Sequence, residues 1–276
     1  AAPYFATGWN PLAHAVGGLM FGVGMAITGN CGFGALARLG GGDLRAFVIV
    51  LVMGISAYVV MSGPLAHLRL LLFPPDLIGF GTSAGYAQLL SQTLGTPLAT
   101  TGAAIGVIVL ALVLASRDFR AQVAMIAWGA VVGGAIAYGW AASSALAEFT
   151  FGASSVQAYS FAEPLGESIL YAMTSTGTTA TFAVGAVGGV WVGAFAGSLY
   201  KGHFRWEACE DPRELRRQIF GSMLMGGGAV IALGCSVGQG LSGISVLAYG
   251  APLTLLGILA GASMGLRSLI AGFHSV

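Results

Sequence analysis

Long apolar runs separated by short polar stretches dominate the chain. Five runs are continuous and close to the roughly 20 residues that a helix needs to cross a bilayer: Ala46–Met61, Leu98–Ser116, Ala121–Ser143, Phe182–Tyr200 and Pro252–Ala271. The pattern therefore predicts an all-α membrane protein built from crossing helices.

Two further apolar runs, Leu12–Leu39 and Arg217–Tyr249, are long enough to cross but are interrupted by glycine-rich sequence around Cys31 and Cys235. The first contains GGLMFGVGMAITGNCGFGALARLGGG and the second GSMLMGGGAVIALGCSVGQGLSGISV. The offset that superposes the cysteines also superposes other positions: Gly17 on Gly221, Gly22 on Gly226, Gly24 on Gly228, Ile27 on Ile231 and Gly34 on Gly238. Broken apolar segments at matching places in two halves indicate a transporter site near the bilayer midplane.

A third interruption follows Glu167–Thr176, which is too short to cross and predicts a re-entrant half-helix. Irregular backbone at membrane depth is tolerated only inside protein or beside a watery cavity. We therefore expect an inverted-repeat helical bundle whose broken and re-entrant helices meet at a central constriction. The bundle forms a single transmembrane domain over residues 1–276, with a first half of about 11–116 and a second of about 163–272.

Basic residues cluster in three loops, which the positive-inside rule places in the cytoplasm: Arg38 and Arg45; Arg117 and Arg120; and Lys201, Arg205, Arg213, Arg216 and Arg217. The N-terminus then lies outside, as do the loops Pro74–Pro97 and Ala145–Gly166, and the C-terminus lies inside near Arg267. The Cys31 segment runs from outside to inside and the Cys235 segment runs the other way, which predicts an inverted repeat.

Composition supports a membrane protein and argues against other classes. Hydrophobic residues make up 56% of the chain and charged residues 8%, whereas soluble domains carry about 25% charged residues. The net charge of +1 argues against nucleic acid as a partner. Three cysteines, two of them in apolar runs, do not suit a secreted disulfide framework. Metal-ligand spacing and a phosphate loop are both missing, so we expect no metal, no cofactor and no enzymatic activity.

The two repeated cysteines are the candidate site. Glycines beside them permit unusual backbone angles and the close approach of a ligand, and inverted symmetry would bring the two thiols face to face near the midplane. The alternative is that both are small buried hydrophobes. Polar or small neighbours of the breaks complete the candidate set, although some hydroxyls could instead bond back to helix carbonyls: Asn30, Gly32, Ser236, Gln239, Ser175 and Thr176.

Three stretches closely resemble the YeeE/YedE family of membrane proteins: GNCGFGALARLGGGDLRA, GCSVGQGLSGISVLAYGAPLTLLGILAG and ESILYAMTSTGTTATFAVGAVGGVWVGAFAGS. The resemblance covers most of the chain from about Gly17. It implies an hourglass-shaped helical protein of the bacterial inner membrane that takes up thiosulfate or a related small sulfur anion. In that family cysteine thiols pass thiosulfate along through S–H···S contacts, and the matching positions are Cys31 and Cys235.

One departure from the family opens a second interpretation. The first half begins almost at its own repeat, so it has no counterpart of Glu167–Thr176 and Phe182–Tyr200, nor of a family cysteine near the N-terminus. The N-terminus is then either cut off or shortened. A shortened homologue could be a non-transporting helical subunit of a larger membrane complex.

The chemistry of thiosulfate sets further expectations. This dianion has a soft sulfur end and a hard sulfonate end, and we expect half-helix dipoles rather than arginines to meet its charge, because strong Arg contacts would hold it too tightly. An uncharged solute would fit the same features. Inside the cell, a soluble sulfur-acceptor protein could dock on the polar connector Lys201–Gln218, where we expect Cys209 to be dispensable.

Overall fold

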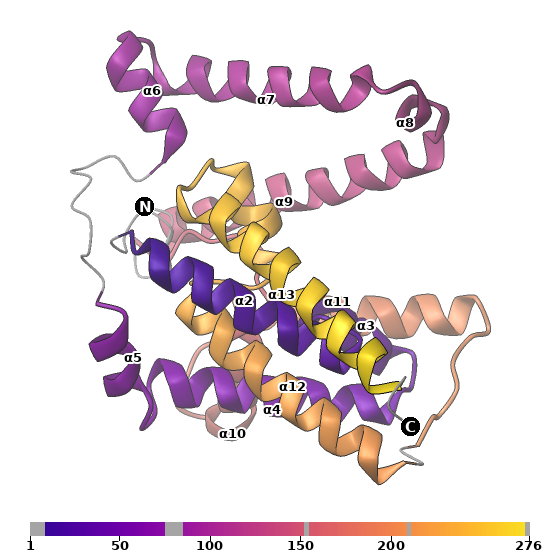
Figure 1. Cartoon of the computed structure of the whole chain (residues 1–276). Helices are drawn as coiled ribbons and strands as arrows, with labels where there is room; N and C mark the ends of the chain where they lie inside the picture. Colours follow the sequence, from indigo (N-terminus) through magenta and orange to yellow (C-terminus); the bar gives the residue numbers. More distant parts are fainter. Residues whose placement is uncertain (1–8, 75–84, 152–154, 209–210, 274–276) are drawn as a thin grey trace.

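The computed structural model describes residues 9–74, 85–151, 155–208 and 211–273, and the regular elements of this part of the chain are all helices (Figure 1). In order, its helices are α2 (Pro11–Thr28), α3 (Gly32–Gly40), α4 (Leu44–Met61), α5 (Ala66–Leu72), α6 (Tyr86–Leu94), α7 (Leu98–Ala115), α8 (Arg117–Ala121), α9 (Val123–Phe149), α10 (Glu163–Thr174), α11 (Phe182–Tyr200), α12 (Pro212–Ile231), the π-helix η1 (Gly238–Gly243) and α13 (Gly250–Phe273).

Six segments of the described chain are long and apolar enough to cross a bilayer: Pro11–Gly40, Leu44–Met61, Leu98–Ala115, Val123–Phe149, Phe182–Tyr200 and Gly250–Ala271. They confirm the all-α membrane class and match the predicted crossings to within a few residues, except that α9 extends to Phe149. Helix α12 is not among the six, because its first turns carry charged residues such as Arg213 and Glu214.

Three short helices were not predicted. Helix α5 follows α4 directly, α6 lies inside Pro74–Pro97, and α8 occupies the stretch around Arg117 and Arg120; the sequence indicated loops at the last two places. Helix α10 was predicted four residues too late. It begins at Glu163 because Pro164, which lacks a backbone N–H, suits the first turn of a helix.

Four helices, α4, α12, α2 and α13, pack in that order through close glycine contacts. A methyl group placed on Gly17 of α2 would lie 2.7 Å from the Gly228 carbonyl oxygen of α12, and one on Gly24 would lie 2.5 Å from the Gly221 carbonyl oxygen. Helices α2 and α12 are therefore antiparallel, and only glycine lets their backbones approach so closely.

The glycine contacts of α2 and α12 follow the internal sequence repeat. Because Gly17 corresponds to Gly221 and Gly24 to Gly228, the two contacts just described exchange under a twofold rotation. Gly22 packs against α13 and its counterpart Gly226 packs against α4 in the same way. Since the rotation exchanges antiparallel helices, its axis is perpendicular to them, which is the arrangement of an inverted repeat.

Helix directions also agree with those expected from charge. Successive glycines of α2 contact successive turns of α13 in the same direction, so these two helices are parallel. The α3–α4 turn, α8 and the connector between α11 and α12 lie at one end of the molecule with the C-terminus, while α5 and α6 lie at the other end (Figure 1). All three basic loops therefore share one face.

An arginine ties two of these loops together. Arg45, at the start of α4, pairs with Asp43 at 3.2 Å and reaches Glu207 of the connector at 3.2 Å. The backbone of the connector bonds the same turn, since Leu44 N–H donates to the Glu207 carbonyl at 3.0 Å. The turn after α3 and the entry to α12 are thus held side by side.

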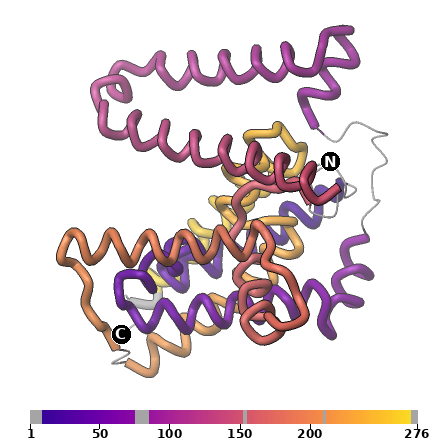
Figure 2. Tube along the Cα trace, turned by 180° about the vertical axis from the view of Figure 1, so that it is seen from behind, coloured from indigo at the N-terminus to yellow at the C-terminus, as the bar shows by residue number. Residues whose placement is uncertain are grey.

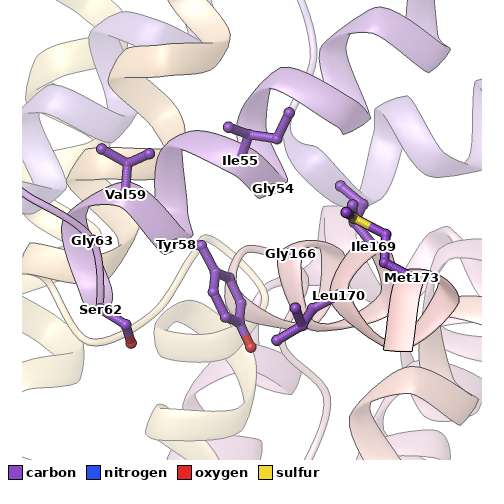
Figure 3. Close-up of a pocket in the computed structure, with 10 residues that line it drawn as sticks. All are labelled: Gly54, Ile55, Tyr58, Val59, Ser62, Gly63, Gly166, Ile169, Leu170 and Met173. Atoms are coloured by element: carbon purple, nitrogen blue, oxygen red, sulfur yellow. The ribbon is translucent and has the colours of Figure 1, made fainter. Parts of the chain in front are cut away.

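Helix α10 is too short to cross a bilayer and ends in a turn before α11, as predicted for a re-entrant segment. It packs on α4, where a methyl group on Gly166 would lie 2.6 Å from the Gly54 carbonyl oxygen. Figure 3 shows the Tyr58 ring between the two helices, beside a pocket of about 340 Å³ that is lined almost wholly by apolar atoms. This pocket offers no chemistry for a small anion.

Helices α6 to α9 form an arm at one side of the bundle in both views (Figures 1 and 2). The arm returns to the centre through α9, where Trp140 Nε1 donates to Ser245 Oγ at 3.0 Å. Gly139 of the same helix lies against the Tyr159 ring. Residues after α9 thereby reach the middle of the bundle.

Candidate functional site

The first break places Cys31 at the start of a short helix. Helix α2 ends at Gly29, which takes a left-handed conformation with φ of 76°. The chain is extended at Cys31, whose Sγ accepts a hydrogen bond from the Gly34 N–H at 3.4 Å and so caps α3. The thiol is half-buried.

The second break repeats this geometry. After α12 the backbone passes through positive φ at Leu233 and Gly234, and Cys235 Sγ then accepts from the Gly238 N–H at 3.3 Å. Gly238 is the counterpart of Gly34, so both thiols accept the equivalent amide. Cys235 is more deeply buried, with 2% of its surface exposed.

An extended segment just before α10 joins the two breaks. Phe161 donates its N–H to Cys235 Sγ at 3.4 Å, and its carbonyl oxygen lies 3.1 Å from the position of a Cβ on Gly32. Cys235 and the residue after Cys31 therefore contact the same residue, Phe161, one through its N–H and the other through its carbonyl. The partly buried Cys31 packs against the same core cluster that contains Cys235 and Phe161.

Sequence reasoning missed this segment, since it fell within Ala145–Gly166, which was expected to be an outer loop. Its hydrogen bonds show how it is fixed: the Tyr159 carbonyl accepts from Ser242 Oγ at 2.8 Å, and Ser160 Oγ lies 3.8 Å from Cys235 Sγ. The segment has neither the helical nor the strand period, so the hydrophobic pattern carried no signal for it.

Four of the six predicted neighbours lie at the breaks. Gly32 is buried against Met53, where a Cβ would come within 2.8 Å of the Met53 sulfur. Gln239 is 1% exposed and donates to the carbonyls of Ala232 and Leu233 at 3.1 and 2.9 Å, which satisfies the broken end of α12. Ser236 is half-buried beside Cys235.

Asn30 connects the first break to an arginine. With its amide turned so that both polar atoms are satisfied, its nitrogen donates to the Gly29 carbonyl at 3.1 Å and its oxygen accepts from Arg38 Nη1 at 2.7 Å. The Arg38 side chain thus extends back along α3 toward the residue that precedes Cys31.

The structure does not bring Ser175 and Thr176 to the thiols. Both are exposed after the C-terminal end of α10. That helix has 12 residues, and at about 1.5 Å per residue it carries them roughly 18 Å from its start beside Phe161. Their assignment to the substrate path stays a prediction. Cys209 lies outside the described residues.

A cavity of about 210 Å³ adjoins the second break on the face that carries α5. Its polar lining comes from Arg69, Gln157, Ser160 and Glu163. The expectation that half-helix dipoles rather than arginines meet the charge of the anion stays a prediction. Helix α5, which the sequence pattern did not predict, places Arg69 at this cavity. The Arg69 Nε atom is buried and has no hydrogen-bond partner among the described residues.

Glu163 opens α10, outside the six crossing segments, and lines the same cavity. Burial raises the pKa of this carboxyl, and the nearby Glu167 carboxylate raises it further. Both causes favour the neutral, protonated form. A neutral Glu163 repels an incoming anion less than a carboxylate would.

A larger cavity, of about 610 Å³, lies between α9 and α11 and contacts both breaks through Phe33 and Val237. Its lining is almost entirely apolar. Lipid chains, rather than a small anion, suit such a surface, because an unpaired ion in an apolar cavity loses its hydration without compensation.

Comparison with known proteins identifies the family of the chain. A family described as sulphur transport matches residues 2–264. The chain is also similar to the thiosulfate transporter TsuA of Spirochaeta thermophila, with 26% identity over 277 aligned positions that cover 91% of this chain and 76% of TsuA. The chain therefore belongs to the sulphur transport family, that of the YeeE/YedE proteins.

Proposed function

We propose that the protein imports thiosulfate, or a closely related small sulfur anion, across the bacterial inner membrane, with Cys235 and then Cys31 as successive thiol contacts. The observation that carries this proposal is the repeated geometry of the two thiols. Each follows a helix break, each accepts the N–H of the glycine three residues later, and both lie at the segment around Phe161. Membership of a sulphur transport family and similarity to a thiosulfate transporter support the substrate class.

The thiols suit this substrate chemically. A neutral thiol is a weak hydrogen-bond donor, and the soft terminal sulfur of thiosulfate is a polarisable acceptor. In both cysteines the Sγ lone pairs already accept a backbone amide, which leaves the S–H free to point toward a passing anion. A weak contact at each step lets the anion leave as readily as it enters, as conduction requires.

Charge is supplied at the two ends of the constriction rather than within it. On one side Arg69 lines the cavity that adjoins Ser160 and Cys235. On the other side Arg38 bonds Asn30, the neighbour of Cys31. Such an arrangement attracts a dianion to either mouth while the thiol contacts between the arginines remain weak. We assign the Arg69 face to the outside, because the three basic loops share the opposite face.

Uptake of ³⁵S-labelled thiosulfate into proteoliposomes of the purified protein tests the proposal. Cys31→Ala and Cys235→Ala should each lose transport, and Cys209→Ser, which removes the third thiol of the chain, is the matched control. Size-exclusion profiles verify that the variants remain folded. Wild-type rates in both alanine variants would refute the thiol mechanism.

The same experiment addresses the second interpretation, a non-transporting helical subunit of a larger complex. A wild-type protein that takes up no thiosulfate, while TsuA reconstituted in parallel does, would favour the subunit. Entry of labelled sulfate at an equal rate would instead show that the substrate class is broader than sulfur anions with a terminal sulfur.

A further inference from the structure

We propose that the 210 Å³ cavity beside α5 is the capture site for the anion, with Arg69 holding the sulfonate oxygens and Ser160 guiding the terminal sulfur to Cys235. The inference rests on the proposed function and names the residue that selects the anion before it meets a thiol. Arg69 is a binding residue in this scheme, and the cysteines pass the anion on.

The position of Arg69 is exceptional in the chain. Of the 11 lysines and arginines, ten lie in or beside the loops and the C-terminal segment that the charge distribution places inside. Arg69 is the remaining one, on the opposite face. The positive-inside rule disfavours a cation on the outer face. An arginine at that position therefore does not serve to orient the protein in the membrane, which points to another role.

The surroundings of Arg69 leave its charge available. Among the described residues every ion pair involves Arg45, and none joins Arg69 to Glu163 although both line the cavity. The Nε atom is buried and has no partner among the described residues. A buried donor without a partner is costly, and an anion in the cavity would supply the missing acceptor.

The cavity also leads to the thiol. Ser160 lines it and places its Oγ 3.8 Å from Cys235 Sγ. The cavity wall includes Leu233 and Gly234, the residues of positive φ that end α12 immediately before Cys235. An anion bound at Arg69 is therefore separated from the first thiol only by the Ser160 side chain and this turn.

Thiosulfate matches the two ends of such a site. The guanidinium group presents a planar fork of N–H donors that suits oxyanions, so it would take the sulfonate end. The soft sulfur end would then face Ser160 and Cys235. Sulfate shares the oxyanion end but has no terminal sulfur, so it should occupy the capture site without being handed to the thiols.

The kinetics of thiosulfate uptake test this assignment. In Arg69→Gln we expect KM to rise roughly 10- to 100-fold, the range for loss of a charge-assisted hydrogen bond, with a much smaller change in maximal rate. Arg69→Lys, which retains the charge, should recover part of the affinity. Arg267→Gln, an exposed arginine at the other end of the molecule, is the matched control.

Equilibrium binding of labelled thiosulfate to the solubilised protein gives a second measurement that does not need transport. Arg69→Gln should bind more weakly than wild type, and added sulfate should compete for wild type but not for the variant. Equal affinity of Arg69→Gln and wild type would overturn the capture site even if transport is normal. Absence of uptake by the wild type would count against the proposed function alone, because binding would still report on Arg69.

Discussion

Adding one methyl group at Gly22 or at Gly226 should separate helix pairs that are equivalent under the repeat. At Gly226 the new Cβ would overlap Ser56 Oγ and lie 2.5 Å from the Met53 carbonyl oxygen. At Gly22 it would overlap the Ile258 carbonyl oxygen and lie 2.8 Å from the Ala262 nitrogen. Each new Cβ would thus meet backbone atoms of a facing helix, and at Gly226 a side-chain hydroxyl as well, so the helices themselves must move.

The cost follows from this overlap. A carbon–oxygen contact of 2.5 Å must open to a normal separation of about 3.5 Å, and forcing an extra methyl into a packed interface costs about 1–3 kcal/mol. Replacing glycine by alanine within a helix also stabilises the helix by about 0.5–1 kcal/mol. Gly193→Ala on α11 measures this stabilisation by itself, because an added Cβ there meets nothing within 4 Å.

Unfolding of the purified protein in mixed micelles by SDS, followed by tryptophan fluorescence, measures these differences. We expect the free energies of unfolding of Gly22→Ala and Gly226→Ala to be about 1–3 kcal/mol lower than that of Gly193→Ala. The two losses should be similar, because the contacts of Gly22 and Gly226 are related by the twofold axis. The reasoning fails if Gly226→Ala is as stable as Gly193→Ala, or if only one of the two variants is affected.

Four further outcomes can be checked. Gln239→Leu should lower the free energy of unfolding by about 1–3 kcal/mol, because it removes the donor to the carbonyls of Ala232 and Leu233 at the end of α12. Gln239→Glu, whose carboxylate also has no N–H to donate, should lower that free energy at least as much. A small thiol reagent should modify the half-buried Cys31 faster than Cys235, as followed by mass spectrometry; equal rates would contradict the burial described. Because burial raises the pKa of Glu163, the KM for thiosulfate should increase as pH rises through the titration of that carboxyl, and Glu163→Gln should abolish the increase. Cys209→Ser should transport normally and lose labelling by an impermeant reagent applied from the cytoplasmic side, whereas labelling from outside would reverse the assigned orientation.

The sequence alone determined the class of the protein and the positions of its two cysteine-bearing helix breaks. Continuous apolar runs are long enough to cross a bilayer whatever they pack against, so α4, α7, α11 and α13 were predicted almost to the residue. The offset between Cys31 and Cys235 is a property of the chain, and it identified the two breaks because glycines recur at the same spacing on both sides. The distribution of lysines and arginines among the loops gave the relative directions of the helices, because the positive-inside rule assigns each loop to one side of the membrane.

Tertiary structure decided which segment completes the site. The extended residues around Phe161 have no periodicity, and they contact Cys235 and Gly32 only because α9 and α10 hold the two ends of the segment in the middle of the bundle. Ser175 and Thr176 show the converse. Their composition suggested a polar lining, but the length of α10 separates them from the thiols.

The same holds for charge. Arg69 stands in the sequence as the single cation on its face, yet the role proposed for it depends on Arg69 lining the same cavity as the end of α12, which is far away in the chain. Apolar length and repeated glycine spacing are local properties that a sequence displays directly. The approach of an arginine to a buried thiol depends on how distant helices pack, and only the folded chain determines that.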